Sequence, residues 1–422
     1  HIFKNQIFGI AITELTSLLA RRSLYCSKTA NGKYSICEEF DNKQGNVLFD
    51  RVEHAWSGGN CKFCGASEAN YSRGGELETY AYQFIHTENP EELFNMKFDV
   101  IVGNPPYQLD DGGFGKSAKP IYHKFIEQAK KLAPSSLAMI IPARWYNGGK
   151  GLDQFRNSML TDKRISKIHD FPDTKDCFPG LNIRGGVCFF LWEKDYIGDC
   201  EVSTHKKENI TSVMKRPLLE DGFNIFVRYN EAIQILHKVT KFQERAFNEI
   251  VSARKPFGLA TNFNDFAKRS GVINDIYLFR FGENGYINQE QVARNNEWTN
   301  QWKVLVPKAS PGDDSYPHLI LSKPLISPPK TCCTETYIVV GPVKNESQAK
   351  NIANYMKTSF FRFMVLLAKS TQDVTKKTYI FAPMQDFNEK WNDKKLYQKY
   401  KITTEDQTFI NTLIRPMELD GE

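Results

Sequence analysis

The sequence predicts an α/β fold for the first half of the chain and a second, differently built domain for the remainder. Up to about residue 200, short apolar runs alternate with amphipathic helical patterns, which is typical of βαβ units. Beyond that point the alternation stops, and six prolines fall between residues 307 and 329. A length of 422 residues is enough for about two to three domains. We therefore expect domains at 1–205 and 206–422.

The first domain contains a regular series of predicted elements. A strand-like run at 7–10 precedes a helical pattern at 13–22. Further apolar runs predict core strands at 82–86, 98–102, 136–141 and 186–192. Apolar residues at helical spacing predict a helix at 121–132. Strands that alternate with helices predict a mostly parallel sheet. In the second half, a strong pattern predicts a helix at 346–369.

Composition excludes several classes of protein. Hydrophobic residues make up 41% and charged residues 25% of the chain, as in an ordinary globular protein. No run of eighteen apolar residues occurs, so a membrane-spanning helix is not expected, and no signal peptide follows His1. Nine cysteines, an odd number, are scattered along the chain. This usage argues against a secreted disulfide scaffold and indicates the cytoplasm.

The cysteine-rich segment at about 26–78 is a predicted insertion with a metal site. Cys61 and Cys64 form a Cys-x-x-Cys pair among glycines, a spacing that lets two thiolates reach one tetrahedral ion. Cys26 and Cys37 lie in the same irregular segment and complete the predicted zinc ligands, with two histidines, His54 and His86, as spare candidates. The alternative is four reduced, unlinked thiols.

The tetrapeptide Asn104-Pro105-Pro106-Tyr107 follows the predicted strand 98–102 after one glycine. Two prolines end the strand's ladder and stiffen the turn, so the Asn104 amide and the Tyr107 ring are presented at the carboxyl edge of the sheet. The Asn104 side-chain oxygen and the Pro105 carbonyl can accept hydrogen bonds from an exocyclic amino group, while Tyr107 stacks on the attached ring. The alternative is a turn that happens to contain Pro-Pro. The strand context favours a chemical site.

The segment FDVIVGNPPYQ resembles the catalytic motif of amino-group methyltransferases that use S-adenosylmethionine. Over nearly its whole length the chain is similar to gamma-type N6-adenine DNA methyltransferases of bacterial restriction–modification systems, through segments such as IFGIAITELTSLLARRSL, IYHKFIEQAKKL and CFPGLNIRGGVCFFLW. The resemblance implies a Rossmann-like methyltransferase domain at 1–205 and a C-terminal α+β target-recognition domain at 206–422. It also implies methyl transfer to adenine N6 in double-stranded DNA, in the bacterial cytoplasm. A restriction endonuclease or helicase would be a partner or a fused domain.

The same resemblance implies roles for individual residues. Asn104, Pro105, Pro106 and Tyr107 would be catalytic, with Tyr107 stacking on an adenine that is extruded from the duplex. Phe178, in the segment CFPGLNIRGG, would be the second stacking ring. A plain core phenylalanine is the alternative for that residue.

The predicted cofactor site departs from the family's pattern. The resemblance implies that Phe8, Gly9, Glu14 and Asn104 contact S-adenosylmethionine. However, no glycine-rich loop precedes Phe8, and Ala11 stands where the family tends to have an acid. We therefore expect the methyltransferase domain to be incomplete at its N-terminus and this chain alone to be inactive in methyl transfer.

The excess positive charge lies in the second half and predicts contact with DNA. Residues 1–200 hold 24 basic and 24 acidic side chains, whereas residues 201–422 hold 31 and 25, which accounts for the net charge of +6. The predicted DNA-contacting residues are Arg254, Lys255, Lys369, Gln372, Lys376 and Lys377. For any one of them, an ordinary solvated charge or polar group is the alternative.

Two other functions compete with DNA methylation. A catalytically inactive DNA-binding fragment would fit the missing glycine-rich loop. A protein-glutamine N-methyltransferase would use the same tetrapeptide, but the second half of more than two hundred residues argues against it.

Overall fold

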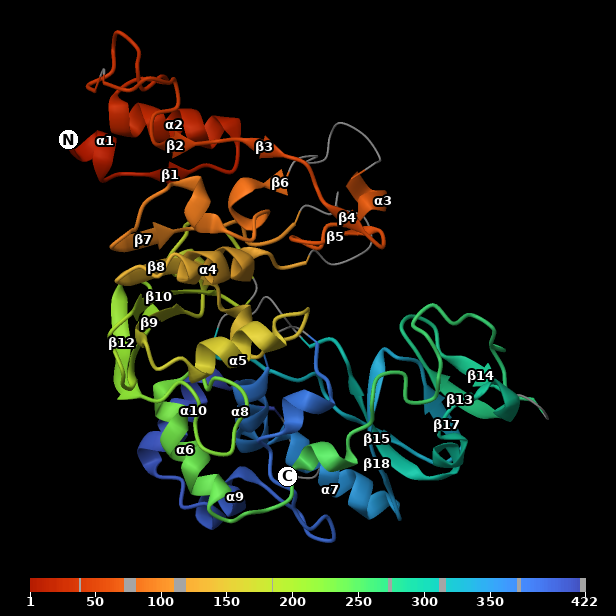
Figure 1. Ribbon diagram of the computed structural model, residues 1–422. Coiled ribbons are helices and arrows are strands. Elements are labelled where there is room, and N and C mark those ends of the chain that lie inside the picture. Colours follow the sequence, from red (N-terminus) through yellow and green to blue (C-terminus); the bar gives the residue numbers. More distant parts are fainter. Residues whose placement is uncertain are drawn as a thin grey trace. The chain divides into compact units, whose positions relative to one another are not determined.

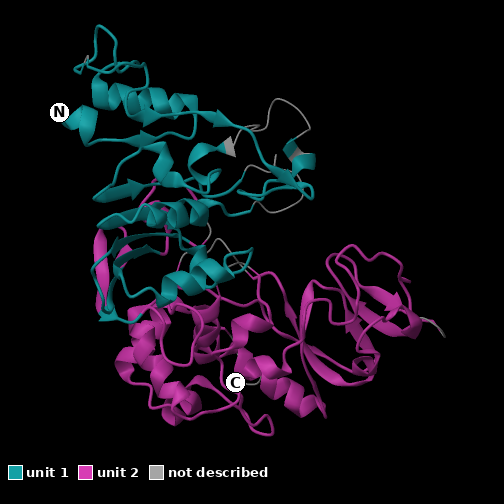
Figure 2. Ribbon diagram, in the orientation of Figure 1, with its two compact units in different colours: residues 1–171, 186–203, 215–217 teal, residues 172–185, 204–214, 218–422 magenta. Residues whose placement is uncertain are grey.

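The computed structural model describes residues 1–37, 39–71, 81–109, 119–183, 185–271, 275–310, 316–369 and 373–417. The chain divides into two compact units (Figure 2). The first comprises 1–171, 186–203 and 215–217, and the second comprises 172–185, 204–214 and 218–422. Among the helices within these described ranges, none is both long and apolar enough to cross a bilayer.

A six-stranded sheet has the strand order β12-β11-β9-β10-β8-β7 (Figure 1). Its strands, in chain order, are β7 Val100–Gly103, β8 Ser136–Pro142, β9 Ile165–Phe171, β10 Val187–Glu193, β11 Cys200–Lys206 and β12 Asn209–Arg216. Strands β7 and β8 are parallel, whereas β10 runs antiparallel to both β8 and β9. The protein is therefore mixed α/β, and the expectation of a mostly parallel sheet is wrong around β10.

The connections explain the mixed directions. Parallel neighbours need a crossover, and helix α4 (Tyr122–Lys131) supplies it between β7 and β8. In the described part of the segment between β9 and β10, the regular structure is one short 3-10 helix, η4 (Thr174–Asp176). No α-helix therefore crosses over in that described part, and β10 pairs antiparallel with β9.

Burial follows the predicted patterns in α4 and in the central strands. Helix α4 buries Tyr122, Phe125, Ile126 and Ala129, the spacing of one helical face, and this confirms the predicted helix at 121–132. The predicted core strands at 136–141 and 186–192 correspond to β8 and β10. The predicted strand at 98–102 corresponds to β7, but β7 lies at the end of the strand order, and Val100 and Val102 are 61% and 75% exposed, so the prediction of a core strand is wrong there. Strand β9 was not predicted, because its sequence ISKIHDF mixes apolar, charged and polar residues.

The N-terminal part contains short elements. Helix α1 (Ile2–Asn5) precedes β1 (Gly9–Ile10), and α2 (Glu14–Tyr25) confirms the predicted helix at 13–22; Thr13 caps it by accepting from the Thr16 N–H. Strand β1 pairs in parallel with β2 (Val47–Leu48). The segment at 26–78 is thus not a plain insertion, since it supplies a partner strand for β1.

Further short elements follow β2. They are β3 Arg51–Val52, β4 Trp56–Ser57, β5 Asn60–Cys61, α3 Glu68–Tyr71, β6 Ala81–Tyr82, η1 Gln83–Ile85 and η2 Pro90–Leu93. The predicted strand at 82–86 is therefore wrong, because the chain turns into a 3-10 helix directly after Tyr82. Between β8 and β9 lie η3 (Ala143–Tyr146) and α5 (Asp153–Thr161).

The second unit contains two three-stranded sheets, β14-β13-β17 and β16-β15-β18. The strands are β13 Ile276–Phe279, β14 Gly285–Ile287, β15 Trp302–Pro307, β16 Leu325–Ser327, β17 Thr331–Cys333 and β18 Tyr337–Val343. The unit's helices are α6 Asn230–Thr240, α7 Glu346–Lys357, α8 Ser359–Ala368, α9 Asp393–Lys399 and α10 Thr404–Leu413, with 3-10 helices η5 Phe247–Ile250, η6 Gln289–Gln291, η7 Asn296–Asn300 and η8 Lys376–Tyr379.

The predicted helix at 346–369 is two helices rather than one. Thr358 separates α7 from α8 in extended conformation, and its hydroxyl caps α8 by accepting from the Phe361 N–H. Every residue of α8 is buried, including Arg362, which donates to the backbone carbonyls of Leu319 and Arg415. Helix α8 therefore forms the centre of a large apolar core shared with α6, α7 and α10.

Asp162 connects α4 with β9 and β10. Its carboxylate is 8% exposed and accepts hydrogen bonds from Lys130 Nζ (2.9 Å), Arg164 Nε (2.7 Å) and Trp192 Nε1 (2.9 Å). Burial opposes its charge, but the bonds from Arg164 and Lys130 outweigh burial and hold the pKa of Asp162 well below its usual range.

We predict that Asp162→Asn lowers the free energy of unfolding by about 2–3 kcal/mol, because it leaves Lys130 without its carboxylate. The depressed pKa means that the wild-type contribution is complete above the unfolded-state pKa of about 3.9 and is lost as the pH falls through the folded-state value. Urea unfolding should show a smaller difference between wild type and variant at about pH 3 than at about pH 7. The exposed control Asp195→Asn should unfold like wild type at both pH values. An equal difference at the two pH values would refute this role for the charge.

Candidate functional site

The tetrapeptide 104–107 lies at the carboxyl end of β7, as the sequence predicts. Gly103, the last residue of β7, pairs with Met139 of the parallel strand β8. Asn104 follows immediately and is exposed, whereas Pro105 is buried. The exposed Asn104 is thus held at the strand end by β7 on one side and by the buried Pro105 on the other. In open α/β sheets this edge is where ligands bind.

Backbone hydrogen bonds close the base of the loop that begins with this tetrapeptide. The Ile121 N–H donates to the Tyr107 carbonyl (3.2 Å), and the Leu109 N–H donates to the Lys119 carbonyl (3.0 Å). Leu109 and Ile121 are both buried. The two ends of the loop are therefore paired directly before α4 begins at Tyr122, and the helix start fixes the position of the tetrapeptide.

The residues predicted to bind the cofactor lie on β1 and α2. The Phe8 ring makes edge-to-face contacts with Phe94 (6.1 Å) and Phe98 (5.8 Å), so it packs against the segment that leads into β7. Gly9 lies against Val47 of β2. Glu14 is exposed in the first turn of α2. The Glu14 carboxylate is therefore accessible to solvent. Phe8 packs within the protein, whether or not it also contacts a cofactor.

Asp50 is a carboxylate that the sequence pattern missed. The parallel pairing of β1 with β2 continues to the Ala11 N–H, which donates to the Leu48 carbonyl (3.0 Å). Asp50, which is exposed, and Ala11 consequently line the same small hollow. Its other walls are Ile10, Ile12, Phe49, Tyr82, Gln83 and Phe125. An acid thus lies beside Ala11, the position at which the resemblance implies an acid. The apolar run Val47-Leu48-Phe49 directly before Asp50 is the signal that could have revealed it.

Phe178 and the predicted DNA-contacting residues belong to the second unit. Phe178 is half-buried, and its N–H donates to the Thr174 carbonyl (2.7 Å). Arg254 pairs with Glu335 (2.9 Å), and Lys255 lies 4.0 Å from the same carboxylate. Glu335 therefore neutralises part of the positive charge of Arg254 and Lys255 within the protein.

The basic residues after α8 differ in exposure. Lys369 is half-buried, and burial lowers its pKa to about 8. Lys376 and Lys377 are exposed at the start of η8. Gln372 lies outside the described residues. Lys376 and Lys377 are consequently better placed for phosphate contact than Lys369.

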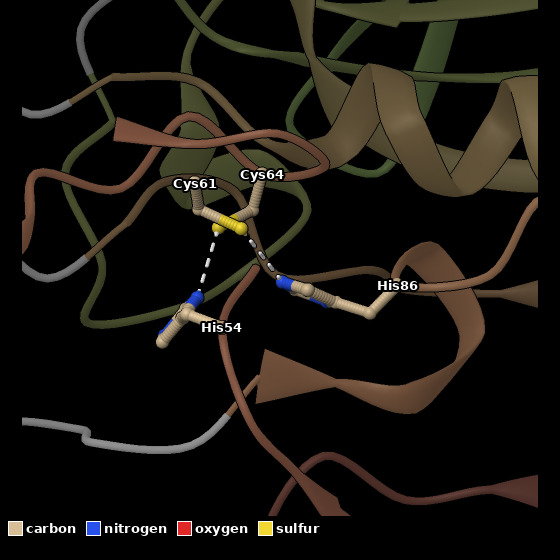
Figure 3. A group of neighbouring side chains, drawn as sticks. All are labelled: His54, Cys61, Cys64 and His86. Carbon is tan, nitrogen blue, oxygen red and sulfur yellow. Dashed lines mark hydrogen bonds between the residues drawn. The ribbon is translucent and has the colours of Figure 1, made fainter. Parts of the chain in front are cut away.

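Cys61 and Cys64 gather with two histidines rather than with the other predicted cysteines. His54, Cys61, Cys64 and His86, here called the His/Cys cluster, each bring a ligand atom within 4.8 Å of all the others (Figure 3). Burial lowers the pKa of His86 to about 4 and also lowers the pKa of His54, which leaves neutral rings suited to a metal. Burial raises the pKa of Cys64 to about 12, so a thiolate there requires a nearby cation.

The predicted ligands Cys26 and Cys37 are not in the group that the described residues form. Cys26 is the exposed C-cap residue of α2 in left-handed conformation. Cys37 packs against the small apolar cluster around Tyr25 and Val47. In the described residues, the fold brings His54 and His86, rather than Cys26 and Cys37, to the Cys-x-x-Cys pair, and Cys37 packs in the apolar cluster.

Comparison with known proteins identifies the family that the first part of the chain resembles. Residues 5–178 match the Eco57I restriction-modification methylase family. The match includes the tetrapeptide 104–107, β1 and the His/Cys cluster. It confirms the resemblance to methyltransferases of restriction–modification systems.

Two curated relatives have names that agree with this family. An "uncharacterized adenine-specific methylase" of Mycoplasma pneumoniae is 38% identical over 229 residues, which are 48% of this chain and 54% of that protein. The Type II methyltransferase M.PstI of Providencia stuartii is 25% identical over 185 residues, or 41% of this chain and 35% of that protein. The chain thus spans about half the length of the first relative and about a third of the second.

Two solved structures of restriction–modification enzymes show a distant likeness to the chain. The type IIG restriction endonuclease BpuSI is 12% identical with a TM-score of 0.30, covering 72% of this chain and 49% of that one. The Type IIL restriction-modification enzyme MmeI, in complex with DNA, is 10% identical with a TM-score of 0.37, covering 67% and 45%. Likeness at this level transfers no residue role to this chain.

Proposed function

We propose that this chain belongs to the methylating machinery of a DNA methyltransferase that modifies adenine N6 in duplex DNA within a restriction–modification system. The observation that carries the proposal is the exposed Asn104 at the carboxyl end of β7, followed by buried Pro105 and by Tyr107. The match of residues 5–178 to a restriction-modification methylase family supports it.

The geometry suits positioning of an amino group. Asn104 Oδ1 and the Pro105 carbonyl would accept the two N–H bonds of the adenine amino group and hold its nitrogen in a fixed orientation. S-adenosylmethionine, when bound, supplies the methyl group as an electrophilic sulfonium. Hydrogen bonds to an amine that develops positive charge become stronger as the charge grows, so the two acceptors favour the transition state over the ground state.

Tyr107 would stack on the target base. An amino group inside a duplex is not accessible to the active site, so the base must leave the stack. The Tyr107 backbone is held by the Ile121 N–H, which fixes the ring's starting position without using its hydroxyl. Phe178 is the proposed second ring.

The cofactor would lie over the carboxyl ends of the strands. Asp50, Glu14, Phe8 and Gly9 are the residues proposed to receive it, in a Rossmann-like arrangement around β1 and β2. Exposed carboxylates at such strand ends are suitable acceptors for the hydroxyl or amino groups of an adenosine moiety. Asp50 lies at the hollow beside Ala11 and fits this role better than Glu14.

Residues 206–422 would form the DNA target-recognition domain, with Lys376 and Lys377 as the phosphate contacts best supported by exposure. Arg254 and Lys255 would contact DNA only by competing with Glu335. The protein would act in the bacterial cytoplasm, with a restriction endonuclease or helicase as a partner or a fused domain.

Asn104→Ala is expected to lower methyl transfer to duplex DNA by about a hundredfold or more, because one acceptor for the developing charge is lost. The measurement is transfer of labelled methyl from S-adenosylmethionine by the full-length protein. Tyr107→Phe should retain activity, whereas Tyr107→Ala should weaken substrate binding, since stacking needs only the ring. The exposed control Asn300→Ala should behave as wild type. Wild-type turnover in Asn104→Ala would remove this residue from the active site.

Asp50→Asn is expected to weaken S-adenosylmethionine binding about tenfold, the effect of losing one charge-assisted hydrogen bond. Titration calorimetry of the full-length protein measures it, with Asp41→Asn as an exposed carboxylate control. Equal affinity in wild type and Asp50→Asn would show that the hollow at Ala11 is not part of the cofactor site.

Replacing Lys376 and Lys377 together by Gln is expected to reduce the slope of log affinity against log salt by about two, since each phosphate contact releases nearly one counterion. The pair Lys390→Gln and Lys394→Gln makes the same change of net charge at other exposed positions. A DNA-binding titration over several salt concentrations distinguishes the two. Identical slopes for the two double variants would count against a specific contact at η8.

A further inference from the structure

The His/Cys cluster has the dimensions of a tetrahedral metal site. Cys61 Sγ lies 3.5 Å from His86 Nε2, and Cys64 Sγ lies 3.5 Å from His54 Nδ1 (Figure 3). Zinc bonded to sulfur at about 2.3 Å and to nitrogen at about 2.0–2.1 Å in tetrahedral geometry separates the two ligand atoms by about 3.5 Å. These two sulfur–nitrogen pairs thus already have the separation that a shared ion would impose, and all four ligand atoms lie within 4.8 Å of one another.

A backbone carbonyl holds the His86 ring in the way that is common for metal-binding histidines. Its Nδ1 lies 2.7 Å from the Tyr82 carbonyl, which can only accept, so Nδ1 carries the proton. The Nε2 lone pair then points toward the cluster. Metal-binding histidines commonly donate their other ring N–H to a backbone carbonyl in this way, which fixes both the tautomer and the orientation of the ring.

The backbone around the cysteines is shaped for two adjacent thiolates. Strands β4 and β5 form a hairpin whose two-residue turn, Gly58-Gly59, has φ of +60° and +77°, a conformation that favours glycine. After Cys61 the chain turns back through Gly65, also at positive φ, and the Ala66 N–H donates to Cys64 Sγ (3.4 Å). This N–H···S bond stabilises negative charge on the sulfur.

We propose that His54, Cys61, Cys64 and His86 bind one structural zinc ion. Two sulfur and two nitrogen ligands in tetrahedral arrangement are the donor set of zinc, and four protein ligands leave no position for a reacting water. Cys61 and Cys64 are 3% and 6% exposed, so the ion would be enclosed by protein. The site is separate from Asn104 and does not depend on the proposed methylation.

The ion would join the cysteine hairpin to helix α4. Gln128 of α4 is buried, and its Nε2 donates to the carbonyls of Phe84 (3.0 Å) and Thr87 (2.8 Å), on either side of His86 in the sequence. Lys119, at the base of the loop, donates to the Gly65 carbonyl between the hairpin and α3 (3.4 Å). A metal holding His86 would therefore stabilise the hairpin against the start and the middle of the helix that positions the tetrapeptide 104–107.

The first test is the metal content and coordination of the wild-type full chain after metal-sparing purification. Elemental analysis should give about one zinc per chain, and X-ray absorption should show two sulfur neighbours at about 2.3 Å and two nitrogen neighbours at about 2.0–2.1 Å. Four sulfur neighbours would restore the set with Cys26 and Cys37 and overturn the proposal. Absence of stoichiometric zinc, or a Cys61–Cys64 disulfide in thiol titration, would overturn it as well.

Matched variants test the ligand assignment. His54→Ala and His86→Ala should each lose most of the zinc, whereas Cys26→Ser and Cys37→Ser should retain it. If the histidine variants fail to fold, cobalt substitution in the wild-type chain decides, because a tetrahedral site with thiolates gives characteristic ligand-field and charge-transfer bands. Zinc retained in both histidine variants, or octahedral cobalt spectra, would refute the assignment.

Hydrogen exchange tests the connection to α4. Removing the metal from the full chain should speed amide exchange at 83–87 and 119–131 and leave 346–368 unchanged. Unchanged exchange at 119–131 after complete metal removal would show that the ion, although bound, does not stabilise α4.

Discussion

The parallel pairing of β7 with β8, made through helix α4, is the constraint on which the candidate site depends. Parallel strands end at the same edge, and the chain can return to that arrangement only by a crossover. Helix α4 is that crossover, and the residues directly before it, Lys119 and Ile121, pair with Leu109 and Tyr107. The position of Asn104 is therefore determined by the strand before it and by the helix after it. The tetrapeptide acquires a fixed place because the strand before it is paired with β8 and because Leu109 and Ile121, on the far side of the tetrapeptide, are buried.

Helix α4 also connects regions that are far apart in the sequence. Its Gln128 holds the segment around His86, and its Lys130 reaches Asp162 at the start of β9. One face of the helix packs on the sheet, and its polar side chains satisfy carbonyls and a carboxylate that would otherwise be buried without partners. The helix thus serves both the core and the polar network, and a change in its position would displace the loop it follows.

The directions of the strands and the breaks in the helices follow from local chemistry that periodicity does not show. Strand β10 is as apolar as a central parallel strand, yet it is antiparallel to both neighbours, because in the described part of the β9–β10 connection no α-helix crosses over. The apolar pattern at 346–369 continues through Thr358, but the threonine hydroxyl caps a new helix and ends the old one. The spacing of hydrophobic residues indicates which positions are buried. The direction of a strand depends on its connections, and the point at which a helix ends depends on its capping residues.

The sequence by itself determined what depends on near neighbours in the chain. An apolar run, a glycine and two prolines were enough to predict the tetrapeptide 104–107 at a strand end, and helical spacing predicted α4. Only the tertiary structure decided which distant residues meet. It placed two histidines rather than two cysteines in the His/Cys cluster, and it brought Asp50 beside Ala11. Spacing specifies the geometry of a turn or a helical face, but contacts between separate segments depend on how the whole chain packs, which short-range patterns do not encode.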